Sequence, residues 1–270
     1  MMNRLLSATI LTAAFAAAAF GQNDGIKPDP RSPEKIQKII AHFTGKEAEF
    51  REALRGYVFN RFATVNTIGL GGQITGTYRR DSFMTFSEDG GRFEKVLFAP
   101  VETTPPGFVT PEDLEDLGGV TPFALDPSNV DKYNFTYLGT ERIDELNLFV
   151  FDVTPKVIPD PKKSKLRLFT GRVWVDIEDE MIVKTRGKAV PETKQNKFPI
   201  VDTYRENIDG KYWFPTYATS DDELVFGDGS VLKIRMRVKY TNYKQGRSEV
   251  RILDDDTPAK PQPSPTPKKP

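Results

Sequence analysis

The sequence lacks the residues that several kinds of chemistry require. It contains no cysteine, which excludes disulfide bonds, thiolate zinc sites, iron–sulfur clusters and cysteine nucleophiles. It contains one histidine, His42, so a site with several histidine ligands is excluded and a Ser-His-Asp triad would depend on that residue alone. The 38 basic and 38 acidic residues give a formal charge of zero, which provides no electrostatic reason to bind nucleic acid.

Long apolar runs are also missing, except at the N-terminus. Arg4 precedes an alanine-rich apolar stretch, and Ala19-Phe20-Gly21 has the small-x-small form of a cleavage site. The stretch is short for a membrane span of about 20 residues. We therefore predict a secretory signal peptide over residues 1–21, cleaved near Gly21, and a mature protein in the periplasm.

The two ends of the mature chain look different from its middle. Residues 254–270 are rich in proline and have no large apolar residue, so we expect a disordered tail. Residues 22–32 are polar, and we predict that they form a linker. The remaining residues, 33–253, include most of the 19 Phe and 9 Tyr and are predicted to form one folded domain.

The domain is expected to begin with an amphipathic helix. Ser32 is suited to the N-cap and Pro33 to the first helical position. Apolar residues then recur at helical spacing: Ile36, Ile39, Ile40, Phe43, Phe50, Leu54 and Tyr57. Gly45 interrupts the pattern, so we expect one kinked helix or two short ones, ending near Gly56.

Beyond Gly56 the apolar period changes from 3.6 residues to two, which is typical of strands. The expected strands cover 57–68, 73–87, 91–100, 133–141, 147–154, 166–177, 181–187, 200–207, 211–219 and 231–243. The first three are predicted to form a meander, and residues 110–119 a short helix. The resulting fold class is mainly β (α+β): a curved antiparallel sheet, or incomplete β-barrel, of about ten strands with a helical lid.

Motifs that carry catalysis are not found. The sequence has neither a G-x-S-x-G nucleophile elbow nor a Walker A motif. His42 follows the polar side of the helix, and the acidic runs 221–223 and 254–256 lack the alternating ligand spacing of a calcium loop. We expect no enzymatic activity, no cofactor and no metal.

Some strands are apolar on both faces, as the runs 83–86 and 149–151 show. Such a sheet needs a cover on each face or a ligand, which suggests an apolar cavity under the helical lid. The proposed lid residues are Ile36, Ile40, Phe43 and Phe50. The proposed ligand-binding residues are Phe59, Met84, Phe86, Phe98, Phe149, Phe151, Trp174 and Trp213, although each of them also suits an ordinary core.

The last expected strand has one basic face and one apolar face. Lys233, Arg235, Arg237 and Lys239 alternate with Ile234, Met236, Val238 and Tyr240. One interpretation is a solvated face that also discourages edge pairing. The other is a surface contact for anionic lipid or an acidic partner.

Three motifs in this order resemble a known family: YLGTERIDELNLFVFDVTPK (137–156), GRVWVDIEDEMIVKTRG (171–187) and IDGKYWFPT (208–216). The pattern of a strand ending in Pro-Lys, a Trp-hydrophobic-Asp triplet and a hairpin is similar to the LolA/LolB-type periplasmic lipoprotein carriers and their outer membrane lipoprotein-sorting relatives. Trp174-Val175-Asp176 and Trp213-Phe214-Pro215 carry the likeness, over roughly residues 33–250.

The resemblance implies an incomplete β-barrel closed by helices, whose cavity holds acyl chains. It implies acylated lipoprotein or lipid as partner, with an envelope membrane protein as a further partner, and no catalysis. The family's carriers have an Arg-Pro pair after the second strand, where this sequence has Arg80-Asp81. The lid-latching role of that arginine is therefore left open.

Two alternatives stay open beside the carrier. Some relatives of this fold act as envelope sensors or interaction proteins without a transported cargo, and a carboxylate hydrolase is a third class. The lining of the cavity separates them: apolar and roomy for a carrier, closed for a sensor, polar with paired acids for a hydrolase.

Overall fold

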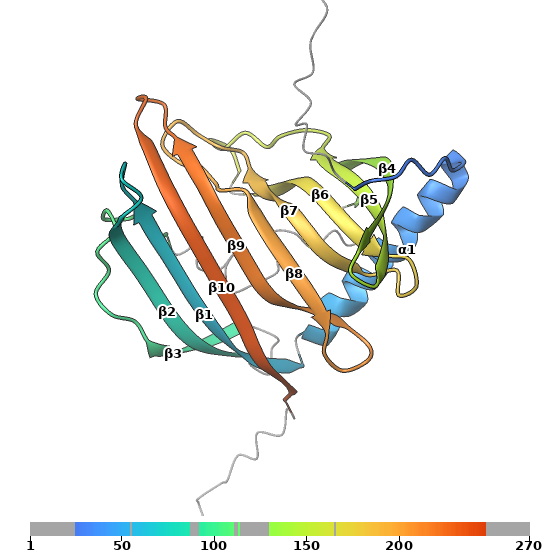
Figure 1. Cartoon of the computed structure of the whole chain (residues 1–270), viewed down its shortest axis with the longest axis horizontal. Helices are drawn as coiled ribbons and strands as arrows, with labels where there is room; N and C mark the ends of the chain where they lie inside the picture. The colour runs from blue at the N-terminus through green and yellow to red at the C-terminus, as the bar shows by residue number, and fades with distance from the viewer. Residues whose placement is uncertain are drawn as a thin grey trace, which may run out of the picture.

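The computed structural model describes residues 25–54, 56–86, 92–110, 113, 130–164 and 166–246. The signal peptide, the C-terminal tail and most of the helix expected over 110–119 lie outside these residues. The described elements, in chain order, are α1 (Pro33–Leu54), β1 (Tyr57–Ile68), β2 (Ile74–Phe86), β3 (Arg92–Phe98), β4 (Tyr133–Ile143), β5 (Leu146–Pro155), β6 (Leu168–Asp176), β7 (Ile182–Val190), β8 (Val201–Asn207), β9 (Trp213–Val225) and β10 (Val231–Gln245) (Figure 1).

The helix begins where the sequence predicts. The Lys35 backbone N–H donates to the Ser32 hydroxyl at 3.4 Å, and Pro33 is the first helical residue. The structure has one uninterrupted helix that runs through Gly45 to Leu54. Among the described residues, no helix combines the length and the apolar character that crossing a membrane requires.

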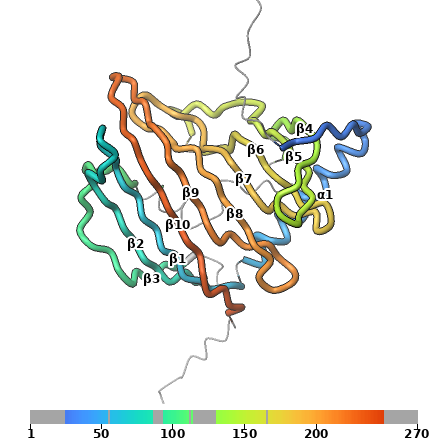
Figure 2. The backbone as a smooth tube through the Cα atoms, in the orientation of Figure 1, coloured from blue at the N-terminus to red at the C-terminus, as the bar shows by residue number. Residues whose placement is uncertain are grey.

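The ten strands form a single antiparallel sheet in the order β3-β2-β1-β10-β9-β8-β7-β6-β5-β4. The terminal strands β3 and β4 do not pair with each other, so the sheet is an open half-barrel (Figure 2). This confirms the predicted fold class and the initial meander. Period-two patterning and short turns favour such neighbour-to-neighbour pairing.

Strand β10 lies inside the sheet, between β1 and β9. Val65 pairs with Met236 and Ala63 with Val238, so the last strand is hydrogen-bonded to the first although the two are far apart in the sequence. The interpretation that its basic face discourages edge pairing is therefore wrong. The alternation itself is confirmed, with Ile234, Met236, Val238 and Tyr240 buried.

The helix crosses one face of the sheet, which we call the inner face (Figure 1). Its first half packs on β4–β7, where the Phe43 ring lies 5.5 Å from Phe151 and 5.9 Å from Phe135 between centroids. Its second half packs on β1, β9 and β10, where the Phe50 ring lies 5.6 Å from Phe214. The core therefore follows the helix from one end of the sheet toward the other.

The opposite, outer face also carries an apolar cluster, which explains the two-sided pattern of β5. Phe149 and Phe151 point to the inner face, while Leu148 and Val150 pack with Trp174 and Val183 on the outer face. Both faces of β5 are covered by protein, so its double apolar pattern needs no ligand.

The described part of the expected linker, residues 25–32, is held on the sheet near its start. Lys27 and Thr140 exchange two backbone hydrogen bonds, of 2.7 and 2.9 Å, and thereby cover the edge of β4. The chain comes so close that a Cβ at Gly139, where φ is 133°, would lie 2.2 Å from the Lys27 carbonyl oxygen. Glycine is therefore required at this position.

Candidate functional site

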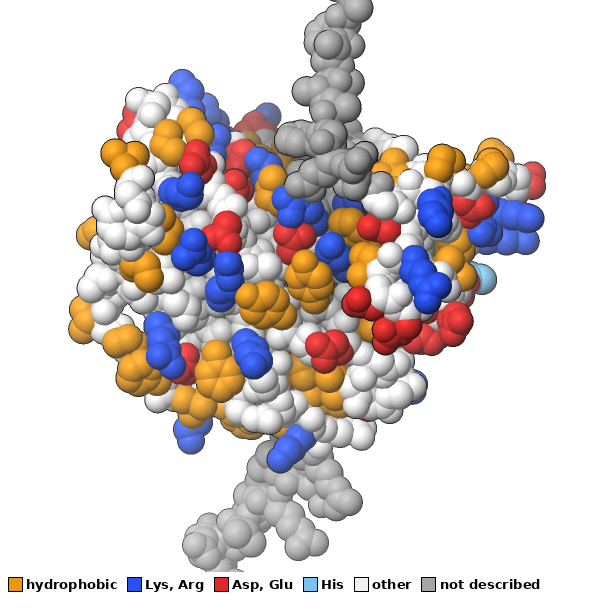
Figure 3. Space-filling model, viewed as in Figure 1, with side chains coloured by type: hydrophobic (Ala, Val, Ile, Leu, Met, Phe, Trp, Pro, Cys, Tyr) orange, Lys and Arg blue, Asp and Glu red, His pale blue; other side chains and the backbone are white. Residues whose placement is uncertain are grey.

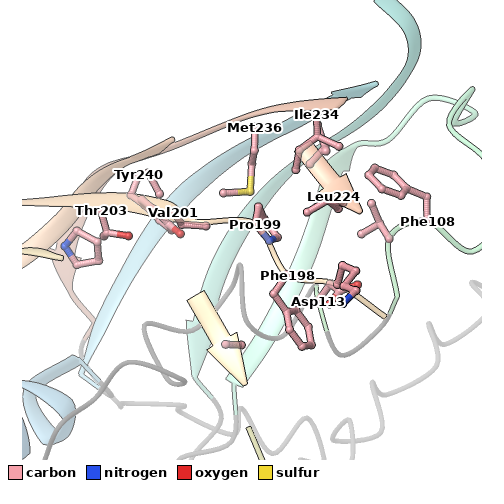
Figure 4. Close-up of a pocket in the computed structure, with 16 residues that line it drawn as sticks. Phe108, Asp113, Phe198, Pro199, Val201, Thr203, Leu224, Ile234, Met236 and Tyr240 are labelled. Carbon is pink, nitrogen blue, oxygen red and sulfur yellow. The ribbon is translucent and has the colours of Figure 1, made fainter. Parts of the chain in front are cut away.

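A pocket of about 150 Å³ lies on the inner face of the sheet, between its strands and the loops that carry Phe108 and Phe198 (Figure 4). The lining consists of apolar or aromatic side chains apart from Asp113, Lys197 and Thr203. The lining residues are Val65, Phe108, Val109, Asp113, Ala189, Lys197, Phe198, Pro199, Val201, Thr203, Pro215, Ala218, Leu224, Ile234, Met236 and Tyr240.

The strands form the pocket floor through their alternation. Side chains two residues apart on a strand, and side chains paired across neighbouring strands, lie on the same face of the sheet. The inner face therefore carries Ile234 and Met236 of β10, Val65 of β1, which pairs with Met236, and Ala218 of β9, which pairs with Val238. No lining residue comes from α1. The described lining therefore comes from strands and loops alone.

The other walls come from two loops that side-chain contacts hold in place. Arg167 lies over the Phe198 ring, 4.6 Å from its centroid, and pairs with Asp113 at 3.3 Å. Thr110 and Asp113 exchange side-chain-to-backbone hydrogen bonds of 2.9 and 3.2 Å, the pattern of a capping box. These bonds fit the helix start expected at Thr110 and fix one wall opposite Met236 and Ile234 (Figure 4).

A buried ion pair fixes α1 to the sheet. Both oxygens of Glu47 accept from Arg205 of β8, at 2.6 and 3.1 Å, and the two side chains are 0% and 1% exposed. Arg205 also lies over the Phe50 ring, 4.8 Å from its centroid. The pair is not predictable from the sequence, because nothing in the pattern of α1 or β8 indicates that Glu47 and Arg205 meet.

Arg80 of β2 binds an acidic side chain of the neighbouring strand. It donates two hydrogen bonds to Glu94 of β3, of 2.9 and 3.0 Å, and Arg61 donates to the same carboxylate at 2.5 Å. Burial raises the pKa of Glu94, but the hydrogen bonds from Arg80 and Ser82 and the charge of Arg61 outweigh it and lower the pKa below its ordinary value. The Arg80 bonds therefore hold β2 to β3.

This cluster gives a pH-dependent prediction. A carboxylate with a lowered folded-state pKa stabilises the protein above its unfolded pKa of about 4.3, and that stabilisation is lost as the pH falls through the folded-state value. We expect Glu94→Gln to be less stable than the wild type at pH 7 and the difference to shrink below about pH 4, measured by urea unfolding. The exposed Glu145→Gln is the control; a pH-independent difference for Glu94→Gln would contradict the prediction.

None of the predicted ligand-binding residues lines this pocket. Phe59, Met84, Phe149 and Phe151 are at most 5% exposed and belong to the core. The Trp174 indole N–H donates to Glu141 at 2.6 Å.

The remaining three lie elsewhere. The Trp213 indole N–H donates to Asp179 at 2.7 Å, Phe98 is half-exposed under Arg79, and the Phe86 side chain lies outside the described part. A role for any of the eight in ligand contact stays a prediction. Strong aromatic character indicates burial, and it does not separate a cavity wall from a filled core.

The structure brings the four predicted lid residues together on one side of α1. Ile40, Phe43 and Phe50 are buried against the sheet, and Ile36 is half-buried beside them. His42 lies on the exposed side, as predicted, and pairs with Glu180 at 2.9 Å. Within the described residues, no group of three or more acidic or histidine side chains is arranged to hold a metal ion.

The basic residues of β10 lie beside acids of β9. Lys233 forms an ion pair with Glu223 at 3.3 Å. Asp221 forms ion pairs with both Arg235 and Arg237, at 2.8 and 2.5 Å. Figure 3 accordingly shows basic and acidic side chains interspersed over this surface. Of the four basic residues, Lys239 alone has no ion pair within the described part of the chain. Contact of this face with an anionic surface stays a prediction.

Comparison with known proteins gives similarity at the level of structure. No family model matches the sequence, and no curated protein shows significant similarity to it. A DUF1329 family protein from Desulfovibrio piger is similar with a TM-score of 0.41 and 13% identity, covering 78% of this chain and 93% of that one.

Two further solved structures come from the proteins that the sequence motifs resemble. An outer membrane lipoprotein-sorting protein domain from Vibrio parahaemolyticus gives a TM-score of 0.37 and 14% identity over 75% of this chain and 92% of that one. A LolA superfamily protein from Nitrosomonas europaea gives 0.33 and 13% over 77% and 92%.

Proposed function

We propose that this chain is an exported binding or carrier protein that holds the acyl chain of a lipoprotein or lipid, or another apolar ligand, in its inner-face pocket. The observation that carries the proposal is the pocket itself: an apolar hollow on the face of an open half-barrel, lined by strands and loops. The resemblance of the sequence motifs to periplasmic lipoprotein carriers supports it. The function involves no bond breaking, and its setting is the periplasm.

The size of the pocket sets the affinity that we expect. A cavity of about 150 Å³ is of the size that holds a benzene ring. It therefore takes about six carbons, and at about 0.8 kcal/mol per methylene this contributes about 5 kcal/mol before the costs of association. A longer chain must extend beyond the pocket, so we expect modest affinity and ready release.

Native mass spectrometry of the full chain, purified from a periplasmic fraction, tests the proposal together with lipid extraction. A bound acylated species or lipid, displaced by a fluorescent fatty-acid probe, is the expected result. A protein free of ligand that also fails to take up the probe would reject the proposal.

A pocket-filling variant locates the site. Ala218 is buried and lines the pocket, so the ring of Ala218→Phe is expected to occupy the space of the ligand. We predict at least a tenfold loss of probe affinity in fluorescence titration. Thr219→Phe is the matched control, because its side chain leaves the same strand on the outer face.

A second pocket-filling variant is available if the first one does not fold. If Ala218→Phe does not fold, Val201→Phe fills the pocket from the neighbouring strand, where the side chain is only half-buried. Unchanged probe affinity in either folded variant would show that the ligand binds elsewhere.

An envelope interaction protein of the same fold, without cargo, is the second candidate. One observation favours it: the terminal strand β3 exposes Phe93, Leu97 and Phe98 by 51–58%. An apolar edge strand is a surface on which a partner's strand can pair. Absence of bound lipid and of probe uptake in the experiment above would favour this function over the carrier.

A further inference from the structure

Two residues that line the pocket are charged, Asp113 and Lys197, and they differ in how closely their charges are paired with other side chains. Asp113 accepts from the Thr110 N–H at 2.9 Å and from the Thr110 hydroxyl at 2.8 Å, and it pairs with Arg167 at 3.3 Å. Its charge is therefore neutralised within the wall, and its carboxylate is not available to a ligand cation.

Lys197 is in a different position. Among the described residues it pairs with Glu192, whose carboxylate oxygen lies 3.9 Å from the ammonium nitrogen. The same oxygen pairs more closely with Lys188, at 2.9 Å, while the other accepts from the Phe198 N–H at 3.1 Å. Within the described residues, Lys197 donates no hydrogen bond. The Glu192 carboxylate thus lies near two ammonium groups, and it is closer to that of Lys188, which does not line the pocket, than to that of Lys197.

The surroundings make this charge available to a ligand. The Lys197 side chain is 24% exposed, so it has lost much of its hydration, and it stands beside Phe198 and Pro199 in an otherwise apolar wall. Among the described residues, Glu192 pairs more closely with Lys188 than with Lys197, so Lys197 brings an ammonium group to the pocket wall with one distant acidic partner.

We propose that the pocket takes an amphiphile whose apolar chain ends in an anionic group, a carboxylate or a phosphate ester, and that Lys197 binds that group. This inference rests on the proposed function and specifies its ligand class. The chain fills the space between Met236 and Phe198, and the anion replaces the hydration that Lys197 has lost. A charge-assisted contact of this kind adds to the burial of the chain.

The test compares three ligands that each have ten carbons and differ in the end group: decanoate, decyl phosphate and decan-1-ol. Each displaces the fluorescent probe from the full chain at pH 8 and low ionic strength. We expect at least one of the anions to bind about fivefold more tightly than the alcohol, and the preference to decline as salt is added. The tighter anion identifies a fatty acid or a phosphate-bearing lipid as the source.

Two variants assign the preference to its residue. Lys197→Gln is expected to remove the preference for the anion while the affinity for decan-1-ol is retained. Lys194→Gln is the matched control, because it removes an exposed lysine from the same loop and does not line the pocket. The control should keep the full preference.

The outcomes separate the inference from the function on which it rests. Equal affinities for the three ligands, or a preference that survives in Lys197→Gln, would overturn the inference and leave the apolar pocket in place. Failure of all three ligands to displace the probe, or failure of the probe to bind, would overturn the proposed function as well.

Discussion

Replacement of Arg205 by methionine is expected to lower the free energy of unfolding by about 3–5 kcal/mol. The substitution leaves the Glu47 carboxylate, which is 0% exposed, without the two hydrogen bonds of 2.6 and 3.1 Å that now neutralise it. A buried charge without a partner costs more than the pair itself contributes, because the low-dielectric interior cannot replace water. The loss should appear in urea unfolding as a lower midpoint at unchanged slope.

The double variant Glu47→Leu/Arg205→Met is the control for this prediction. It removes both charges and refills most of their volume with apolar groups, so we expect it to recover most of the lost stability. If the double variant were as unstable as Arg205→Met, packing rather than charge would explain the loss. A loss below about 1 kcal/mol in the single variant would show that the pair is solvated in solution.

The Glu47–Arg205 pair also restricts movement of α1 relative to the inner face. Any movement of the helix away from the sheet must separate Glu47 from Arg205, since these residues join α1 to β8. The ion pair therefore connects the middle of the helix to the sheet through β8, while Arg80 of β2 binds Glu94 of β3.

Phe43→Ala is expected to be the second large effect, a loss of about 3–5 kcal/mol in the free energy of unfolding. The ring is fully buried and contacts Phe135 and Phe151, so its removal leaves a cavity between α1 and the sheet. Urea unfolding measures the loss, and hydrogen exchange of the α1 amides shows whether the helix loosens before the sheet does.

An exposed position on the same helix provides the reference for Phe43. Lys38→Ala changes a solvent-facing side chain of α1 and should shift stability by no more than about 0.5 kcal/mol. A loss of less than about 1 kcal/mol in Phe43→Ala, with fast exchange throughout α1 in the wild type, would show that the helix sits loosely on the sheet and would contradict the packing described above.

The strands were predictable because their signals are local. Strand β1 covers the predicted residues 57–68, and β10 follows its predicted alternation of basic and apolar side chains. Ser32 and Pro33 likewise mark the start of α1. Periodicity and capping depend on residues within a few positions of each other, so they can be read without knowing the fold.

The pocket was not predictable in the same way. The sequence pattern favours large aromatic residues as its lining, whereas the structure lines it mainly with aliphatic side chains such as Val65, Ala218 and Met236. The alternation of β10 does contain a signal for the pocket, because it marks Ile234, Met236 and Tyr240 as one apolar face. What was missing was the pairing of β10 with β1, which brings these residues next to Val65.

The sequence by itself determined the elements, their antiparallel class and the amphipathic face of α1, because each of these depends on side chains close together in the chain. Only the tertiary structure decided where α1 ends on the sheet, which strand holds Glu47, and that Lys197 meets an apolar hollow. These features join residues far apart in sequence, such as Glu47 and Arg205. Such contacts depend on strand order and curvature, which local patterning does not specify.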